Sequence, residues 1–117
     1  MKNLRDLTVI IVTFHTPENI VLGCLRSINN DEVRILIIEN SSTFTHEQKI
    51  KSEFSNVKII CTGKNLGYGK GNNFGIQHTE SDYALILNPD VICDKDFFSN
   101  ISKVINEAKD FSIIGCQ

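Results

Sequence analysis

The sequence predicts an α/β domain in which a parallel sheet lies between helices on both faces, giving three layers. Short runs rich in β-branched residues alternate with helix patterns along the chain, and this alternation is typical of right-handed βαβ units. The first runs are almost continuously apolar, as expected for strands buried on both faces. Polar clusters follow the runs, at the sheet edge where such folds bind ligands.

The first strand is expected at residues 7–14, a nearly unbroken β-branched run. A helix start follows it. We expect Thr16 to be the N-cap, Pro17 to lie in the first turn, and Glu18 to interact favourably with the positive end of the helix dipole. Apolar residues at helical spacing continue this helix until the polar residues 29–31 end it.

The second buried strand is expected at residues 33–38, with a polar loop at 39–43. A helix is predicted over residues 45–54, with Ile50 facing inward. The third strand should then occupy residues 57–61.

A glycine-rich turn at residues 65–73 opens the next predicted helix, 69–78. The fourth strand is expected at 83–87 and is stopped by Asn-Pro-Asp. Asp94 is predicted to be the N-cap of a strongly amphipathic helix. Residues 111–116 indicate the start of a fifth strand.

The composition fits one small soluble domain. The chain has 117 residues, of which 41% are hydrophobic and 22% charged, and its net charge of −2 argues against a nucleic-acid partner. The longest apolar run is far shorter than the roughly 20 residues that span a bilayer. No signal-peptide pattern is present, so a cytoplasmic location is expected.

The cysteines are evenly spread and form no Cys-x-x-Cys pair, which disfavours a zinc site. We expect them to be buried free thiols in a reducing compartment.

The turn at residues 65–73 combines glycines with amide side chains. Gly67, Gly69 and Gly71 allow the backbone to approach a ligand, and the helix N-terminus that follows favours an anion. The spacing G-x-G-x-G matches neither the dinucleotide fingerprint nor the P-loop. A tight strand-to-helix turn without a ligand is therefore an open alternative.

Two acidic residues follow predicted strands. Asp90, beside Asn88, can hold a hard divalent cation that bridges two phosphates, because Mg²⁺ and Mn²⁺ need few protein carboxylates. Asn-Pro-Asp is also ordinary turn chemistry. Glu39 can accept hydrogen bonds from a ribose or a base, and the alternative is a solvated loop acid. The histidines lack the spacing of metal ligands.

The ordered set of motifs resembles the N-terminal half of glycosyltransferase family 2, inverting GT-A enzymes that use nucleotide sugars. The matching segments are residues 9–15, 24–28, 37–42, 65–76 and 85–90. The Asn-Pro-Asp variant and the Asn-x-Gly-x-Gly loop are most similar to the rhamnosyltransferase-like branch, which builds bacterial surface polysaccharides. The resemblance implies a Rossmann-like, GT-A nucleotide-diphospho-sugar-binding half-domain over residues 1–117.

The resemblance also implies roles for particular residues. Thr13 and Glu39 would contact the nucleoside, and the stretch from Asn65 to Asn73 would shape the diphosphate and nucleoside pocket. Asp90 would ligate Mg²⁺ or Mn²⁺. The residues expected to bind the donor or the metal are Thr13, Glu39, Asn65, Gly67, Lys70, Asn72, Asn73, Asn88 and Asp90.

This sequence departs from the family pattern at three of its positions. Glu39 replaces the usual Asp, His15 stands where Asn is common, and Asn88 replaces the first acid of the Asp-x-Asp motif. One carboxylate is thus left for the metal, and metal affinity without nucleotide is expected to be low.

The implied reaction is inverting transfer from a dTDP- or UDP-linked sugar, with dTDP-rhamnose among the candidates. The acceptor would be a saccharide or a lipid-linked saccharide. The protein itself would associate peripherally with the inner face of the membrane. Family members continue into an acceptor-binding half that carries the general base. No residue of this chain matches that base, so the 117 residues are predicted to bind donor but not to transfer sugar alone.

Two other functions remain as alternatives. One is a non-catalytic nucleotide-binding module, or an inactive fragment, of the same fold. The other is a flavodoxin-like receiver or a dinucleotide domain. A receiver needs acids after its first strand and a phosphorylatable Asp after its third, but Thr13-Phe14 and Cys61-Thr62 occupy those places, which disfavours it.

Overall fold

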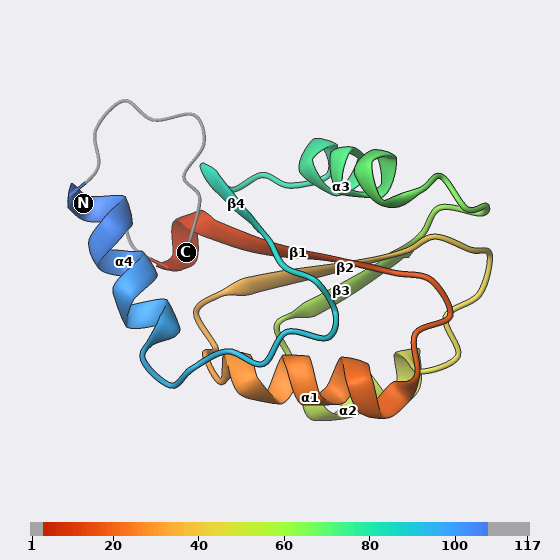
Figure 1. Cartoon of the computed structure of the whole chain (residues 1–117), viewed down its shortest axis with the longest axis horizontal. Helices are drawn as coiled ribbons and strands as arrows, with labels where there is room; N and C mark the ends of the chain where they lie inside the picture. Colours follow the sequence, from red (N-terminus) through yellow and green to blue (C-terminus); the bar gives the residue numbers. More distant parts are fainter. Residues whose placement is uncertain (1–3, 108–117) are drawn as a thin grey trace.

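A parallel sheet with the strand order β3-β2-β1-β4 forms the middle layer of the fold (Figure 1). The computed structural model describes residues 4–107 of the chain. The strands are β1 (Leu7–Thr13), β2 (Arg34–Glu39), β3 (Val57–Cys61) and β4 (Tyr83–Ile86). The first four predicted strands are present, each within two residues of its expected bounds. The predicted fifth strand, residues 111–116, lies outside the described residues.

Helices cover both faces of the sheet. The helices of the described chain are the short 3-10 helix η1 (Leu4–Asp6), α1 (Glu18–Ile28), α2 (Glu47–Glu53), α3 (Tyr68–Gln77) and α4 (Phe97–Glu107). Helix α3 lies on one face, whereas α1 and α2 lie on the other (Figure 1). The three-layer α/β architecture is therefore confirmed.

Strand β1 forms the centre of the core because every one of its residues is buried. Its side chains alternate between two apolar clusters. Val9 and Ile11 belong to the larger cluster with α1 and Ile50 of α2, while Ile10 and Val12 belong to the smaller cluster beneath α3. Burying an aliphatic side chain is worth roughly 1.5–3 kcal/mol, so both faces of this strand contribute to stability.

The strand register aligns the carboxyl ends of three strands. Thr13 of β1 pairs with Glu39 of β2, and Glu39 pairs with Cys61 of β3. Next to β1, the N–H of Leu87 donates to the carbonyl of Ile10, 3.0 Å away, just after β4 ends. The loops that follow the strands therefore begin at one edge of the sheet.

Both predicted N-caps are wrong. Pro17 is the N-cap of α1 and makes no side-chain cap, while the Thr16 hydroxyl instead accepts a hydrogen bond from the N–H of Phe14. Helix α4 begins at Phe97, and the Asp94 carboxylate accepts the N–H of Asp96 in the preceding turn. In both cases the side-chain oxygen accepts a backbone N–H in a tight turn instead of at the start of a helix, and the two roles use the same kind of hydrogen bond.

Helix α3 lies close to the sheet because two of its three glycines face the strands. A Cβ at Gly75 would lie 2.6 Å from Cγ2 of Ile10, and one at Gly71 would lie 3.0 Å from Cγ1 of Val12. A glycine inside a helix costs about 1 kcal/mol relative to alanine. At Gly71 and Gly75 the close packing of the helix on the sheet requires a glycine.

This packing yields a stability prediction. We expect Gly75→Ala to lower the free energy of unfolding by about 2 kcal/mol, because the new methyl group overlaps a buried, β-branched side chain. Gly69→Ala, in the same helix with nothing within 4 Å of its Cβ, is the control and should be neutral or slightly stabilising. Urea unfolding measures both, and equal midpoints would contradict the packing argument.

Candidate functional site

The carboxylate of Glu39 joins the loops that follow β1 and β2. Its Oε1 accepts the Thr13 hydroxyl at 2.7 Å, while Oε2 accepts the N–H of His15 at 3.2 Å and the Ser41 hydroxyl. Only 1% of Glu39 is exposed. The prediction of a polar loop beginning at Glu39 is wrong, since it is the last residue of β2, and the solvated-acid alternative is excluded.

Glu39 also stabilises an unusual backbone conformation. His15 has φ of +50°, in the left-handed region that residues other than glycine rarely adopt. The hydrogen bond from its N–H to Glu39 fixes this turn and leaves the neighbouring Phe14 ring 52% exposed at the edge of the site.

The glycine-rich loop is tied to the end of β2 by Asn40. The side-chain amide of Asn40 donates to the carbonyl of Gly67, 2.9 Å away, and Asn65 accepts the N–H of Gly67 at 2.9 Å. Gly67 has φ of +86°, so this turn needs a glycine. Asn65 therefore shapes the loop through its oxygen.

The start of α3 combines free donors with a positive charge. Gly67 is its N-cap and makes no side-chain cap, so the first N–H groups of this ten-residue helix are open to a ligand. Lys70 and Asn73 are exposed beside them. Asn72 is only 6% exposed, and its Oδ1 has no hydrogen-bond partner among the described residues.

The loop after β4 completes the edge. The Tyr68 hydroxyl donates to Oδ1 of Asn88, which connects this loop to the start of α3. Asp90 is exposed and makes neither a hydrogen bond nor an ion pair within the described part of the chain. These contacts confirm the predicted convergence of four strand-end loops on one edge of the sheet.

The structure thus places the sequence-predicted residues at the same edge of the sheet, but their solvent exposure differs. Thr13, Glu39 and Asn72 are buried, whereas Asn65, Lys70 and Asp90 are exposed. Sequence reasoning gave no individual role to three residues of this hydrogen-bond network: Asn40, Ser41 and Tyr68. All three lie in segments that the sequence analysis expects at this edge, but their hydrogen bonds to distant residues could not be seen in local patterns.

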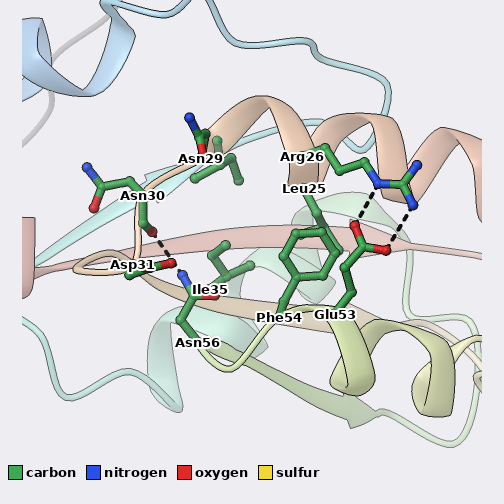
Figure 2. Close-up of a pocket in the computed structure, with 10 residues that line it drawn as sticks. Leu25, Arg26, Asn29, Asn30, Asp31, Ile35, Glu53, Phe54 and Asn56 are labelled. Atoms are coloured by element: carbon green, nitrogen blue, oxygen red, sulfur yellow. Dashed lines mark hydrogen bonds and ion pairs between the residues drawn. The ribbon is translucent and has the colours of Figure 1, made fainter.

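A hollow of about 280 Å³ lies elsewhere, between the C-terminal ends of α1 and α2 (Figure 2). Several of its polar groups are already paired. Arg26 forms a bidentate ion pair with Glu53, and Asn56 donates to the carbonyl of Asn30. These residues lie at the amino ends of β2 and β3, opposite the strand-end loops, so we do not assign the site to this hollow.

The donor set at the edge suits a hard cation bound together with a phosphate ligand. Residues 4–107 contain no group of three or more His, Cys, Asp or Glu side chains that could hold a metal by themselves. Asp90 offers one unpaired carboxylate. That fits Mg²⁺ or Mn²⁺, whose remaining ligands are commonly phosphate and water oxygens.

The cysteines near this loop are thiols at neutral pH. Burial, then the neighbouring Cys93 and Asp90, raise the pKa of Cys24 to about 12. Burial also raises the pKa of Cys93. Both are free and buried as expected, whereas Cys61 is exposed at the end of edge strand β3, contrary to the prediction; Cys116 lies outside the described residues.

The chain belongs to glycosyl transferase family 2, whose family model matches residues 8–117. It is 30% identical over 115 residues to the low-salt glycan biosynthesis hexosyltransferase Agl10 of Haloferax volcanii, covering 95% of this chain and 36% of that protein. It is 24% identical over 102 residues to the dTDP-rhamnosyl transferase RfbF of Shigella flexneri, covering 87% of this chain and 31% of that protein.

The fold also matches solved structures. The crystal structure of S. aureus TarS residues 1–349 in complex with UDP superposes with a TM-score of 0.72 at 21% identity, covering 86% of this chain and 32% of that one. This likeness concerns the fold. The chain spans about a third of the length of these relatives.

Within residues 4–107, no helix combines the length and the apolar character that crossing a membrane requires.

The burial of Glu39 leads to a prediction. We expect Glu39→Ala to lower the free energy of unfolding by about 3 kcal/mol, because buried donors lose their acceptor. Glu39→Gln, which keeps one carbonyl oxygen and nearly the same shape, should lose less. Glu47→Ala removes an exposed carboxylate of α2 and is the control. Urea midpoints that rank Glu39→Ala with Glu47→Ala would contradict the role of Glu39 described above.

Proposed function

We propose that this chain binds the donor and the divalent cation of an inverting glycosyltransferase that uses a UDP- or dTDP-linked sugar. One observation carries the proposal. In a member of glycosyl transferase family 2, four strand-end loops are hydrogen-bonded into one edge. The loop after β4 contacts the start of α3 through Asn88, and the Asp90 carboxylate, two residues further on, is unpaired within the described chain.

Charge complementarity supports a diphosphate at this edge. The open N–H groups and positive dipole end of α3, with Lys70 in its first turn, favour a ligand with negative charge. The Asp90 carboxylate and the side-chain oxygen of Asn88 would hold Mg²⁺ or Mn²⁺. When bound, the cation neutralises charge that develops on the leaving diphosphate.

The loops after β1 and β2 suit the nucleoside. The exposed Phe14 ring offers a face on which a base can stack. The hydrogen bonds to Glu39 occupy three of the roughly four acceptor positions of a carboxylate, so one position remains for a hydroxyl or N–H of the ligand. Thr13 orients that carboxylate.

The complete reaction also needs an acceptor. In an inverting transfer the acceptor oxygen bonds to the anomeric carbon as the bond from that carbon to the diphosphate oxygen breaks, and a general base takes the hydroxyl proton. The relatives named above indicate a glycan acceptor, and we propose a saccharide or lipid-linked saccharide at the cytoplasmic face of the membrane. We assign no residue of this chain as the general base.

Calorimetry tests the donor and metal assignment. We expect the 117-residue chain to bind UDP or dTDP more tightly with Mn²⁺ than with EDTA, and Asp90→Asn to abolish most of that difference. Asp31→Asn makes the same charge change at the opposite edge of the sheet and should bind like the parent. Equal Mn²⁺ dependence in Asp90→Asn and the parent would refute the metal assignment.

Asn72 provides a second test, because its buried Oδ1 has no partner among the described residues. We expect Asn72→Leu to leave the protein as stable as the parent or more so, since an unpaired buried acceptor is replaced by an apolar group of similar size. If the ligand supplies the missing donor, nucleotide affinity should fall by about tenfold. Unchanged affinity would exclude Asn72 from the site.

A further inference from the structure

The loop that carries Asp90 lies along one face of helix α1. Cys93, which follows Asp90 by three residues, donates its N–H to the hydroxyl of Ser27 at 2.8 Å, and the Cys24 thiol is 3.9 Å from the carbonyl of Asn88, which precedes Asp90 by two. Between these contacts, a Cβ at Gly23 would lie 3.5 Å from Cδ1 of Ile92. Residues 23–27 of α1 thus lie against the loop on both sides of Asp90, at Asn88 and at Ile92 and Cys93.

The Ser27 hydroxyl is held in a fixed orientation. It donates to the carbonyl of Cys24, 2.7 Å away, while it accepts the N–H of Cys93. Its proton therefore points back along the helix and its lone pair points at the loop. A hydroxyl that donates and accepts at once connects the backbone of α1 to the backbone of the loop.

The other end of the loop is fixed by the sheet. The N–H of Leu87 donates to the carbonyl of Ile10, and the side chain of Asn88 accepts the Tyr68 hydroxyl. Between Asn88 and Cys93 the loop makes few such contacts, and Ile92 is 67% exposed. Asp90 is therefore placed by an anchor on each side, and Ser27 supplies the anchor on the C-terminal side.

We propose that Ser27 is a positioning residue, whose hydroxyl fixes the loop end so that the Asp90 carboxylate is held where the cation of a nucleotide diphosphate needs it. The inference rests on the proposed function, because it concerns the same cation. It predicts that Ser27 affects the coupling between cation and nucleotide, rather than nucleotide affinity as such.

Two substitutions of nearly equal shape isolate the hydroxyl. Ser27→Thr keeps the donor and acceptor, whereas Ser27→Val lacks both and has the same β-branched form. Because both variants carry the same helix propensity and packing cost, their difference reports on the hydrogen bonds. Ser52→Ala is the matched control, since the Ser52 hydroxyl also donates to a carbonyl three residues back but contacts no loop.

Calorimetry of the 117-residue chain with UDP, in Mn²⁺ and in EDTA, is the first measurement. We expect Ser27→Val to weaken binding of UDP with Mn²⁺ by about fivefold, the size of one neutral hydrogen bond, with UDP binding in EDTA unchanged. Ser27→Thr and Ser52→Ala should match the parent. In the ligand-free protein, amide hydrogen exchange at Cys93 should be faster in Ser27→Val than in Ser27→Thr.

The other outcomes overturn the proposal in distinguishable ways. If Ser27→Val matches the parent, Ser27 does not position Asp90. If Ser27→Val and Ser27→Thr are equally impaired, or if affinity falls equally in EDTA, the role is packing alone. If the parent shows no Mn²⁺ dependence and Asp90→Asn binds like it, the metal assignment itself fails and this inference fails with it.

Discussion

The hydrogen bonds of the buried Glu39 carboxylate are the constraint on which the site edge depends. A charged group at the end of a central strand is costly to bury unless donors surround it. Thr13 supplies one of those donors from the end of β1, and His15 and Ser41 supply the others from the loops after β1 and β2. By satisfying the charge, they also fix the turn after β1, including the left-handed conformation of His15. Stability and ligand-site geometry therefore depend on the same contacts.

The same edge contains groups that the fold leaves open. Asp90 makes no internal ion pair or hydrogen bond in the described chain, the first N–H groups of α3 lack a side-chain cap, and Oδ1 of Asn72 is buried without a partner. At the opposite edge of the sheet, Arg26 and Glu53 are paired with each other, and this pairing lowers the pKa of Glu53. Unsatisfied polar groups gathered beside a rigid network are typical of a pre-organised binding site.

Much of the fold was predictable because burial of a parallel strand is visible in its composition. The run at β1 is apolar on both faces, as a strand between two helical layers must be, and the spacing in α1 indicates one buried face. Helix starts were less predictable. Thr16 and Asp94 could each cap a helix or a turn, and the local sequence does not distinguish these uses because both satisfy backbone N–H groups equally well.

By itself, the sequence determined the α/β alternation, the edge at which polar loops gather and the family, because these follow from local patterns and ordered motifs. The tertiary structure alone decided that Glu39 is buried rather than solvated, that Asn40 supports Gly67, and that Ser27 contacts the end of the Asp90 loop. Each of these contacts joins residues 24 to 66 positions apart. Only the packing of helices and strands determines which such distant groups meet.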